Sequence, residues 1–284
     1  MIDLRDAWHD LLARRCALAP SLAPYGELLE RWAAYAPPAQ GLSWSAERCR
    51  ETWGRGVPLA AEARPRLDAA HLEDLLGDAM EAVAALDPAR APALQRLAGA
   101  WDAGALGPQA LLPRREGIGD GSIEAASRLD AAAVAFLAYA TLRPVLEAWL
   151  APTRPHFADA HWGRGVCPFC GAPPGFVDVI EGGHRRLACH FCGGAWSFAK
   201  LRCPLCGVEG TTDLQRLQAE GEDAGYVIAG CRACHAYVKE LDRRERWNGG
   251  PPLLEDWGSP HLDVVARREG LVKPLPALLD LAAR

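Results

Sequence analysis

Four Cys-x-x-Cys pairs between residues 167 and 234 constrain the fold of this chain more than any other feature. Eight of its ten cysteines lie in this window. The pairs are Cys167/Cys170, Cys189/Cys192, Cys203/Cys206 and Cys231/Cys234. Two intervening residues let both thiols of a pair face one point from a single tight turn, and two such turns supply the four thiolates of a tetrahedral zinc or iron site. The sequence therefore predicts that all eight cysteines bind metal.

The intervals between the pairs predict which of them combine. Eighteen residues separate Cys170 from Cys189 and 24 separate Cys206 from Cys231, and each interval is long enough for a β-hairpin that returns the second turn to the first. The first and third pairs share the form Cys-Pro-x-Cys-Gly. Glycine at that position can take the positive φ that frees backbone N–H groups to face the sulfurs. We therefore predict one site from the first two pairs and another from the last two, with an interleaved pairing as the alternative.

Three other uses of the cysteines fit the sequence less well. Disulfides need an oxidising compartment, but the first 15 residues carry three aspartates and lack the apolar stretch of a secretory signal. A thioredoxin-like motif needs one pair at a strand-to-helix turn, not four pairs with hairpin spacing. An iron–sulfur cluster also uses four thiolates, yet the duplicated turn favours mononuclear sites. Reduced, metal-bound thiols lead us to expect a cytoplasmic protein.

Residues 1–152 are expected to form an all-α domain, because they are rich in Ala and Leu and poor in β-branched residues. The predicted helices are Asp3 to Arg15, Tyr25 to Tyr35, Ser45 to Trp53, His71 to Leu86, Asp87 to Trp101, and a last long helix from Asp120 or Ser122 through Leu150 with a kink at Pro144. The longest uninterrupted apolar run, Ala131 to Ala140, is too short to span a bilayer.

After Pro152 the chain becomes dense in Gly, Pro and Cys, and short β-type runs appear. Hairpins are expected from residues 175–180 with 185–188, and from 214–217 with 225–229, so each hairpin lies between the two cysteine turns of one site. This division predicts a first rubredoxin-like four-cysteine module at 153–200, a second at 201–242, and a C-terminal tail with a short helix at 243–284. The predicted fold class is α+β, with the helical domain followed by two tandem rubredoxin-like or zinc-ribbon modules.

Composition narrows the range of functions. The net charge is −5, and residues 151–284 hold 16 basic and 16 acidic residues, so the metal modules lack the basic excess of a sequence-independent phosphate binder. No Ser-His-Asp or paired-carboxylate arrangement stands out, so we expect no catalysis.

A closed shell of four thiolates is structural by default. Because hairpins this short cannot bury a sufficient core, metal must supply folding free energy, about 10–16 kcal/mol in small zinc fingers. Cys189→Ser is then expected to unfold the first module and leave the helical half intact.

The cysteine pairs belong to a longer pattern of flanking residues. It runs from Trp162-x-x-Gly165-x-Cys167-Pro-x-Cys170-Gly171-x-Pro173, through Cys189-x-x-Cys192-x-x-x-Trp196 and Cys203-x-x-Cys206, to Cys231-x-x-Cys234-x-x-Tyr237-Val238-Lys239, with Asp256 and Asp263 in the tail. This pattern resembles the formate dehydrogenase accessory protein family, FdhE. The helical half agrees in architecture more than in residues, with faint matches at Leu18 to Gln40 and Leu142-Arg143-Pro144. Lys200 stands where the family commonly has Arg.

The resemblance implies a helical domain followed by two rubredoxin-like modules that hold iron. It also implies a cytoplasmic assembly factor that binds the catalytic subunit of a respiratory molybdenum- or tungsten-dependent formate dehydrogenase before export by the twin-arginine route. We therefore expect two metal ions per chain, iron from the resemblance or zinc. We expect no nucleic-acid partner and no membrane span. A zinc-ribbon protein that binds nucleic acid or a transcription component, and a rubredoxin-type electron carrier, remain as alternatives.

Residues beside the cysteines are candidates for contact with a partner. Those predicted to bind it are Trp196, Lys200, Tyr237 and Lys239. Trp196, Tyr237 and Lys239 are expected on the outward side of the cysteine turns, where each contacts a partner or shields the metal from water. The predicted docking surface is the groove where the helical half meets the metal modules. His190 and His235 adjoin ligands and are expected to support them rather than to bind metal.

Overall fold

The computed structural model describes residues 3–35, 41–114, 117–159 and 162–282. The N-terminal half is helical, as predicted. Its α-helices are α1 (Leu4–Arg14), α2 (Ala19–Ala34), α3 (Ala46–Gly54), α4 (Leu59–Ala63), α5 (Ala69–Leu86), α6 (Ala91–Asp102), α7 (Ser122–Ser127) and α8 (Ala131–Leu150). The shorter elements are the 3-10 turns η1 (Pro88–Arg90), η2 (Pro108–Leu111) and η3 (Ala151–His156), and the hairpin β1 (Pro113–Arg114) with β2 (Gly117–Ile118).

Short polar side chains start several of these helices. The hydroxyl of Ser45 accepts the N–H of Arg48 at 3.3 Å, which confirms the predicted start of α3. Helix α2 begins at Ala19, six residues before the predicted Tyr25. The predicted start was wrong, because Pro20 lies in the first turn of α2, where proline is tolerated since its missing N–H has no partner to lose.

The predicted last long helix is two helices in the structure. Helix α7 ends at Ser127 and is followed by Arg128, whose φ of 63° is left-handed. Asp130 then caps α8 by accepting the N–H of Ala133 at 2.8 Å. Pro144 lies inside α8. Among the described residues, the stretch Ala131–His156 is long and apolar enough to cross a membrane by length and composition, but 78% of an 18-residue apolar segment within it is buried inside the protein, as in the core helix of a folded domain.

The C-terminal half contains one six-stranded sheet, in the order β5-β4-β3-β8-β7-β6. The strands are β3 (Phe176–Val179), β4 (Arg185–Ala188), β5 (Ala195–Phe198), β6 (Leu214–Gln218), β7 (Tyr226–Cys231) and β8 (Tyr237–Asp242). Both predicted hairpins are present, as β3–β4 and β6–β7. Parallel pairing of β3 with β8, in which Val177 lies opposite Glu240, joins the three strands of each half of the sheet. The predicted α+β fold class is confirmed.

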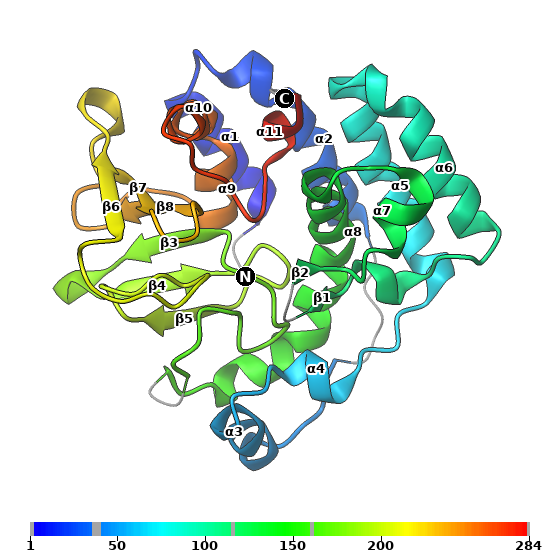
Figure 1. Cartoon of the computed structure of the whole chain (residues 1–284), viewed down its shortest axis with the longest axis horizontal. Coiled ribbons are helices and arrows are strands. Elements are labelled where there is room, and N and C mark those ends of the chain that lie inside the picture. The colour runs from blue at the N-terminus through cyan, green and yellow to red at the C-terminus, as the bar shows by residue number, and fades with distance from the viewer. Residues whose placement is uncertain (1–2, 36–40, 115–116, 160–161, 283–284) are drawn as a thin grey trace.

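Residues 252–282 pack against both halves of the protein. They form α9 (Pro252–Trp257), α10 (Pro260–Arg268) and α11 (Leu278–Ala282), which lie beside α1 and α2 and next to the sheet (Figure 1). Trp257 is fully buried, stacks on Tyr25 at a ring-centroid distance of 4.5 Å and meets Trp8 edge-on at 6.3 Å. These rings place the C-terminal segment in the same hydrophobic core as the first two helices.

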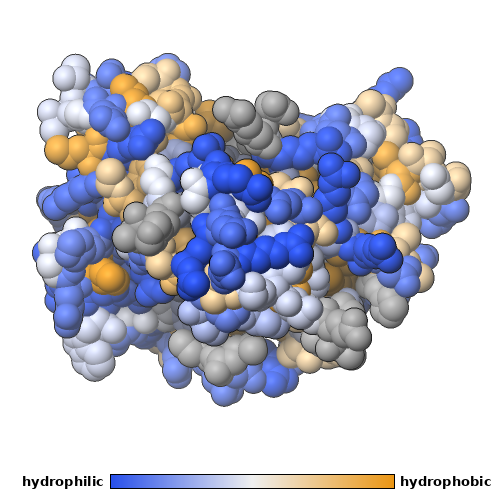
Figure 2. All heavy atoms as spheres, turned by 90° about the horizontal axis from the view of Figure 1, so that it is seen from below, coloured by the Kyte–Doolittle hydropathy of each residue, from blue (hydrophilic) through white to orange (hydrophobic). Residues whose placement is uncertain are grey.

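The surface carries no large apolar patch on the face seen in Figure 2. Hydrophilic residues cover most of that face, and apolar residues form small, separate areas on it. Scattered apolar residues are normal on a folded protein. On this face, hydropathy alone does not mark a docking site.

Candidate metal centres

The structure brings the eight paired cysteines into the two groups that their spacing predicts. Site one consists of Cys167, Cys170, Cys189 and Cys192, and site two of Cys203, Cys206, Cys231 and Cys234; within each, the four sulfurs lie within 4.8 Å of one another. The interleaved alternative is wrong, because each hairpin returns the second turn of a site to the first.

The sulfur positions fit a tetrahedral ion. Four thiolates at about 2.3 Å from one metal lie about 3.8 Å apart. In site one the Sγ of Cys167 lies 3.6 Å from that of Cys192, and the Sγ of Cys170 lies 3.4 Å from that of Cys189. The corresponding distances in site two are 3.8 and 3.7 Å. None of the ten cysteines forms a disulfide. Each set can hold one metal ion, and its donors suit zinc or iron.

All four cysteine turns share one backbone pattern. The first cysteine donates its N–H to the carbonyl of the residue five positions later, with N···O distances of 2.8 to 2.9 Å. In the three turns that carry glycine, the residue four positions after the first cysteine returns an N–H to that cysteine's carbonyl. That position is left-handed in every turn, and it is occupied by Gly171 (φ 86°), Gly193 (φ 68°), Gly207 (φ 80°) and His235 (φ 56°). The glycine predicted for two turns therefore occurs in three. His235 occupies the fourth, where it is exposed and strained rather than supporting a ligand.

Backbone N–H groups also face the sulfurs, as the turn geometry predicts. The N–H groups of Gly194, Val208 and Ala236 bond to the sulfurs of Cys192, Cys206 and Cys234. Burial alone would raise the pKa of the Cys206 thiol, but the N–H of Val208 and the neighbouring thiols outweigh that effect and lower it. A lowered pKa favours the thiolate, which is the form that binds metal.

The helical half holds both turns of site one. Trp53 Nε1 donates to the carbonyl of Pro168 at 3.0 Å, and Ala60 N donates to that of Phe169 at 2.8 Å. Arg143, buried on α8, donates from Nη1 to the carbonyl of His190 at 3.0 Å, and Arg154 donates to the carbonyl of Cys192. All four cysteines of site one are buried in the main core.

Sequence reasoning missed these supporting residues as functional positions. Arg143 was visible only as a basic residue within an apolar helix and as part of a faint family match. Its guanidinium also bonds Glu147 Oε2 at 2.8 Å, so its charge is paired inside the protein. A single sequence does not show which carbonyl groups a buried arginine reaches, because those groups come from a distant turn.

Site two is more open than site one. Cys203 and Cys231 are buried, but Cys206 is exposed and Cys234 is half-buried. Its first turn rests on the segment before site one, since a Cβ at Gly165 would lie 1.7 Å from the carbonyl oxygen of Pro204. Glycine is required there by this close approach of two backbones. The two sites are therefore joined in space but differ in their exposure to water.

We expect two metal ions per chain, and we expect the ion of site two to leave first. A chelator reaches Cys206 from solvent, whereas site one opens only when core packing opens, so the two release rates should differ by at least about tenfold. Release is followed with a metal-sensitive dye, and freed thiols are alkylated and mapped by mass spectrometry. Modification of Cys206 and Cys234 before Cys167 supports the assignment. A single release phase, or one ion per folded chain, would contradict it.

A buried ionic cluster lies between the sheet and the C-terminal helices. Lys239, at 0% exposure, reaches Asp263 Oδ2 at 2.7 Å and Asp256 Oδ1 at 3.0 Å. Lys273 lies 2.7 Å from Asp256 Oδ1, and its pKa is raised well above the ordinary value because nearby carboxylates outweigh the effect of burial. The pKa of Asp256 is lowered, since Lys239 and Lys273 offset the effect of its own burial. Each lysine of the cluster is therefore buried together with the aspartates that neutralise its charge.

The cluster also reaches site one through His190. His190 Nε2 lies 2.9 Å from Asp256 Oδ2, so the ring donates from Nε2, and its buried Nδ1 has no hydrogen-bond partner. A Cβ at Gly175 would lie 2.2 to 2.4 Å from ring atoms of His190, so this glycine makes room for the ring. His190, which follows Cys189 in the chain, thus links the second turn of site one to Asp256.

Three of the four predicted partner-binding residues are not on the surface. Trp196, Tyr237 and Lys239 are each at most 1% exposed, and only Lys200 is exposed. The expectation that these three face outward is wrong. Trp196 Nε1 donates to the carbonyl of Arg164 at 3.1 Å, and Tyr237 OH donates to Asp263 Oδ1 at 2.7 Å, because both strands turn these side chains into the protein.

Comparisons with known proteins point to one family. The chain is 33% identical over 119 residues to a protein named FdhE homolog from Stutzerimonas stutzeri, 30% over 143 residues to one from Aquifex aeolicus, and 28% over 162 residues to one from Pseudomonas aeruginosa. The alignments cover 40 to 53% of this chain and 38 to 50% of the relatives. The chain thus spans half or less of the length of these relatives. No family model matches the sequence.

The fold comparison extends over nearly the whole chain. The crystal structure of the FdhE protein from Pseudomonas aeruginosa superposes with a TM-score of 0.61 at 21% identity, over 96% of this chain and 94% of that one. At this identity the match shows the fold. Together with the sequence relatives, it confirms the resemblance to the FdhE family that the cysteine motifs indicate.

Proposed function

We propose that this FdhE-type protein is a non-catalytic accessory protein that binds the catalytic subunit of a formate dehydrogenase in the cytoplasm during maturation of that enzyme. The observation that supports this most is the pair of four-cysteine sites in a chain with FdhE relatives. Formate dehydrogenase is proposed as the client because the cysteine motifs resemble those of the FdhE family.

The eight cysteines are the proposed metal ligands. When bound, a metal ion in such a shell stabilises the fold and, if it is iron, can also carry an electron. Four protein thiolates fill the tetrahedral shell, so the set offers no further position to a substrate. The role proposed for sites one and two is therefore to stabilise the sheet, so that its surface can bind the catalytic subunit.

A double variant, Tyr237→Ala with Lys239→Ala, would not test a docking surface, because both side chains are buried. Removal of Lys239 takes one buried cation away from Asp256 and Asp263, which destabilises the fold. If this variant no longer captured a client, the cause would be unfolding rather than loss of a contact. A test of the proposed function must use the folded protein with its metal content measured on the same sample.

The expected result is capture of a formate dehydrogenase catalytic subunit by the purified, metal-loaded chain. A tagged chain is incubated with the client before and after insertion of the client's cofactors, and bound protein is identified by mass spectrometry. Preference for the incomplete client supports a role in maturation. Absence of any captured catalytic subunit, with both metal sites filled, refutes the proposal, and capture of DNA instead favours the zinc-ribbon alternative.

A further inference from the structure

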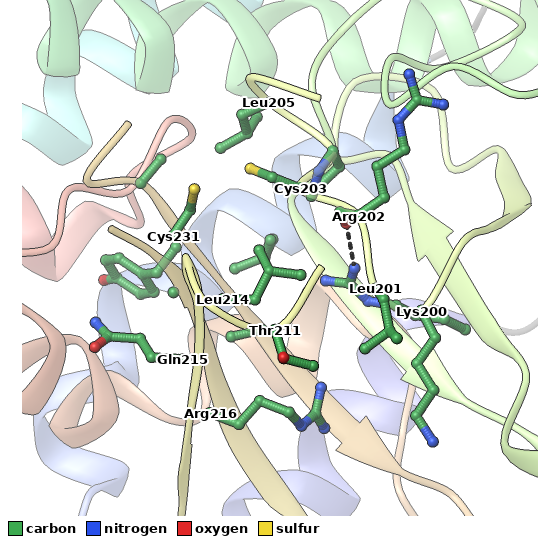
Figure 3. Close-up of a pocket in the computed structure, with 17 residues that line it drawn as sticks. Lys200, Leu201, Arg202, Cys203, Leu205, Thr211, Leu214, Gln215, Arg216 and Cys231 are labelled. Atoms are coloured by element: carbon green, nitrogen blue, oxygen red, sulfur yellow. Dashed lines mark hydrogen bonds between the residues drawn. The ribbon is translucent and has the colours of Figure 1, made fainter. Parts of the chain in front are cut away.

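A small pocket opens beside site two, between the first turn of that site and strands β6 to β8. Its cavity is about 110 Å³, and its apolar lining includes Leu201, Leu205, Leu214 and Val238 (Figure 3). Figure 3 shows Cys203 and Cys231 at one end and the side chains of Lys200 and Arg216 at the other. Leu201 is 54% exposed, so its apolar side chain is accessible to a partner at the pocket.

Positive charge is in excess at the open end of this pocket. Arg185, Lys200 and Arg216 line it, and the adjoining hollow that they share also holds Arg244 and the carboxylates of Glu240, Asp242 and Glu245. Glu240 is fully buried and pairs with two of these arginines, at 2.6 Å from Arg185 Nε and also with Arg216. These four cations against three carboxylates leave a formal excess of one positive charge. No ion pair or hydrogen bond joins Lys200 to any residue in the described ranges, so its charge is free to meet a ligand.

The same place is an edge of the sheet. Strand β6 is the last in the strand order, so it pairs with β7 on one side and with no described strand of the sheet on the other. Edge strands present unpaired backbone groups that a further strand can bind. Leu214 and Arg216 are two residues apart on β6, so their side chains share one face of the sheet, and both line the pocket. A strand added at this edge would place one side chain opposite Leu214 and the next on that face opposite Arg216.

We propose that the β6 edge and this pocket bind an extended segment of a partner protein that carries an apolar residue and an acidic residue two positions apart. The apolar side chain enters the pocket beside Leu201 and Leu214, and the carboxylate meets Lys200 and Arg216. Such cross-strand pairs are the ordinary unit of sheet recognition. The proposal rests on the proposed function only for the source of the segment, which would be the catalytic subunit.

The size of the cavity favours a peptide side chain over a nucleotide or a cofactor. Sites for small molecules usually enclose about 300–1,000 Å³. The present cavity of about 110 Å³ suits one medium apolar side chain. Nucleic acid also seeks cations, but its phosphates would leave the apolar part of the pocket unfilled. The positive charge of the pocket therefore favours an acidic partner, and the apolar cavity favours a partner with an apolar side chain beside its acidic one.

Lysine content allows a sharp test. The sequence has three lysines, and two of them, Lys239 and Lys273, are buried in the ionic cluster. Lys200 is therefore the one exposed lysine of the chain. A carbodiimide joins a lysine amine directly to a carboxylate that touches it. With the metal-loaded protein and a short extended peptide that carries Leu and Asp two positions apart, we expect a cross-link between that Asp and Lys200.

Binding of the labelled peptide is measured by fluorescence anisotropy. Lys200→Glu should weaken it about tenfold, because a favourable contact becomes a repulsive one. Leu201→Asp should weaken it as well. Arg66→Glu makes the same charge change at an exposed site in the helical half and should bind as wild type. Metal content and thermal melts of each variant show that it is folded.

Several outcomes would overturn the inference. Equal binding by wild type and Lys200→Glu would do so, as would equal binding of a peptide in which Lys replaces the Asp. A single-stranded oligonucleotide that binds at Lys200, where the peptide does not, would assign the edge to nucleic acid. Failure of the inference is separable from failure of the proposed function. If the Lys200→Glu variant captures the catalytic subunit as well as wild type does, this surface is not the binding site, but the proposed function is still supported.

Discussion

Cys189→Ser is expected to unfold the helical half together with the sheet, whereas Cys206→Ser is expected to disturb only the surroundings of site two. Cys189 belongs to the core that contains the helices, and Arg143 and Trp53 tie both turns of site one to that core. Cys206 is exposed, and the four cysteines of site two lie outside the hydrophobic clusters. Metal binding worth about 10–16 kcal/mol is comparable with the whole stability of a typical domain, about 5–15 kcal/mol.

Far-UV circular dichroism and thermal melts measure this difference. For Cys189→Ser we expect loss of most helical signal at room temperature, and for Cys206→Ser a small change in signal with one metal ion retained. Cys49→Ser is the matched control, because it places a hydroxyl in the same core without touching a metal set. Its cost should be about 1–3 kcal/mol. Equal melts for Cys189→Ser and Cys206→Ser would show that site one is not part of the core.

This expectation differs from the one that the sequence supports. Spacing alone divides the chain into a helical half and independent small modules, so loss of one site was expected to remain local. The contacts that join them are between residues far apart in the chain, such as Arg143 with His190 and Trp53 with Pro168. Such pairs leave no periodic pattern in one sequence, because each is a single contact between two elements.

The metal sites could be predicted because their signals are local. A Cys-x-x-Cys turn and its following glycine fix a short piece of backbone, and the hairpin between two turns fixes which pairs meet. Parallel pairing of β3 with β8 had no such signal, since it joins strands about 60 residues apart. Strand β8 was also missed because its buried charges, Lys239 and Glu240, break the apolar pattern expected of an inner strand.

Nearness to a ligand in sequence does not determine which way a side chain faces. Trp196, Tyr237 and Lys239 follow their ligands closely, yet the strands that carry them turn them inward. Lys200 follows the end of β5 and stays at the surface. Lys200 is thus the one exposed residue among the four predicted to contact a partner.

Asp256→Ala is expected to cost about 3–5 kcal/mol of folding free energy, the usual penalty for removing one partner of a buried ion pair. Asp256 is fully buried and serves three groups at once, Lys239, Lys273 and His190. Its loss leaves two lysines to share the remaining carboxylates. It also leaves His190 with no partner on Nε2, when its Nδ1 already has none.

Chemical denaturation followed by circular dichroism gives the free energy of unfolding for each variant. Asp256→Asn should lie between wild type and Asp256→Ala, because an amide oxygen still accepts from a lysine but carries no charge. Glu209→Ala is the control, since Glu209 pairs with Arg202 at a side-chain exposure of 71%, where an ion pair contributes little. If Asp256→Ala unfolds at the same denaturant concentration as Glu209→Ala, the buried cluster does not fasten the C-terminal helices to the sheet, and their attachment must come from apolar packing, such as that of Trp257, Leu254 and Leu262.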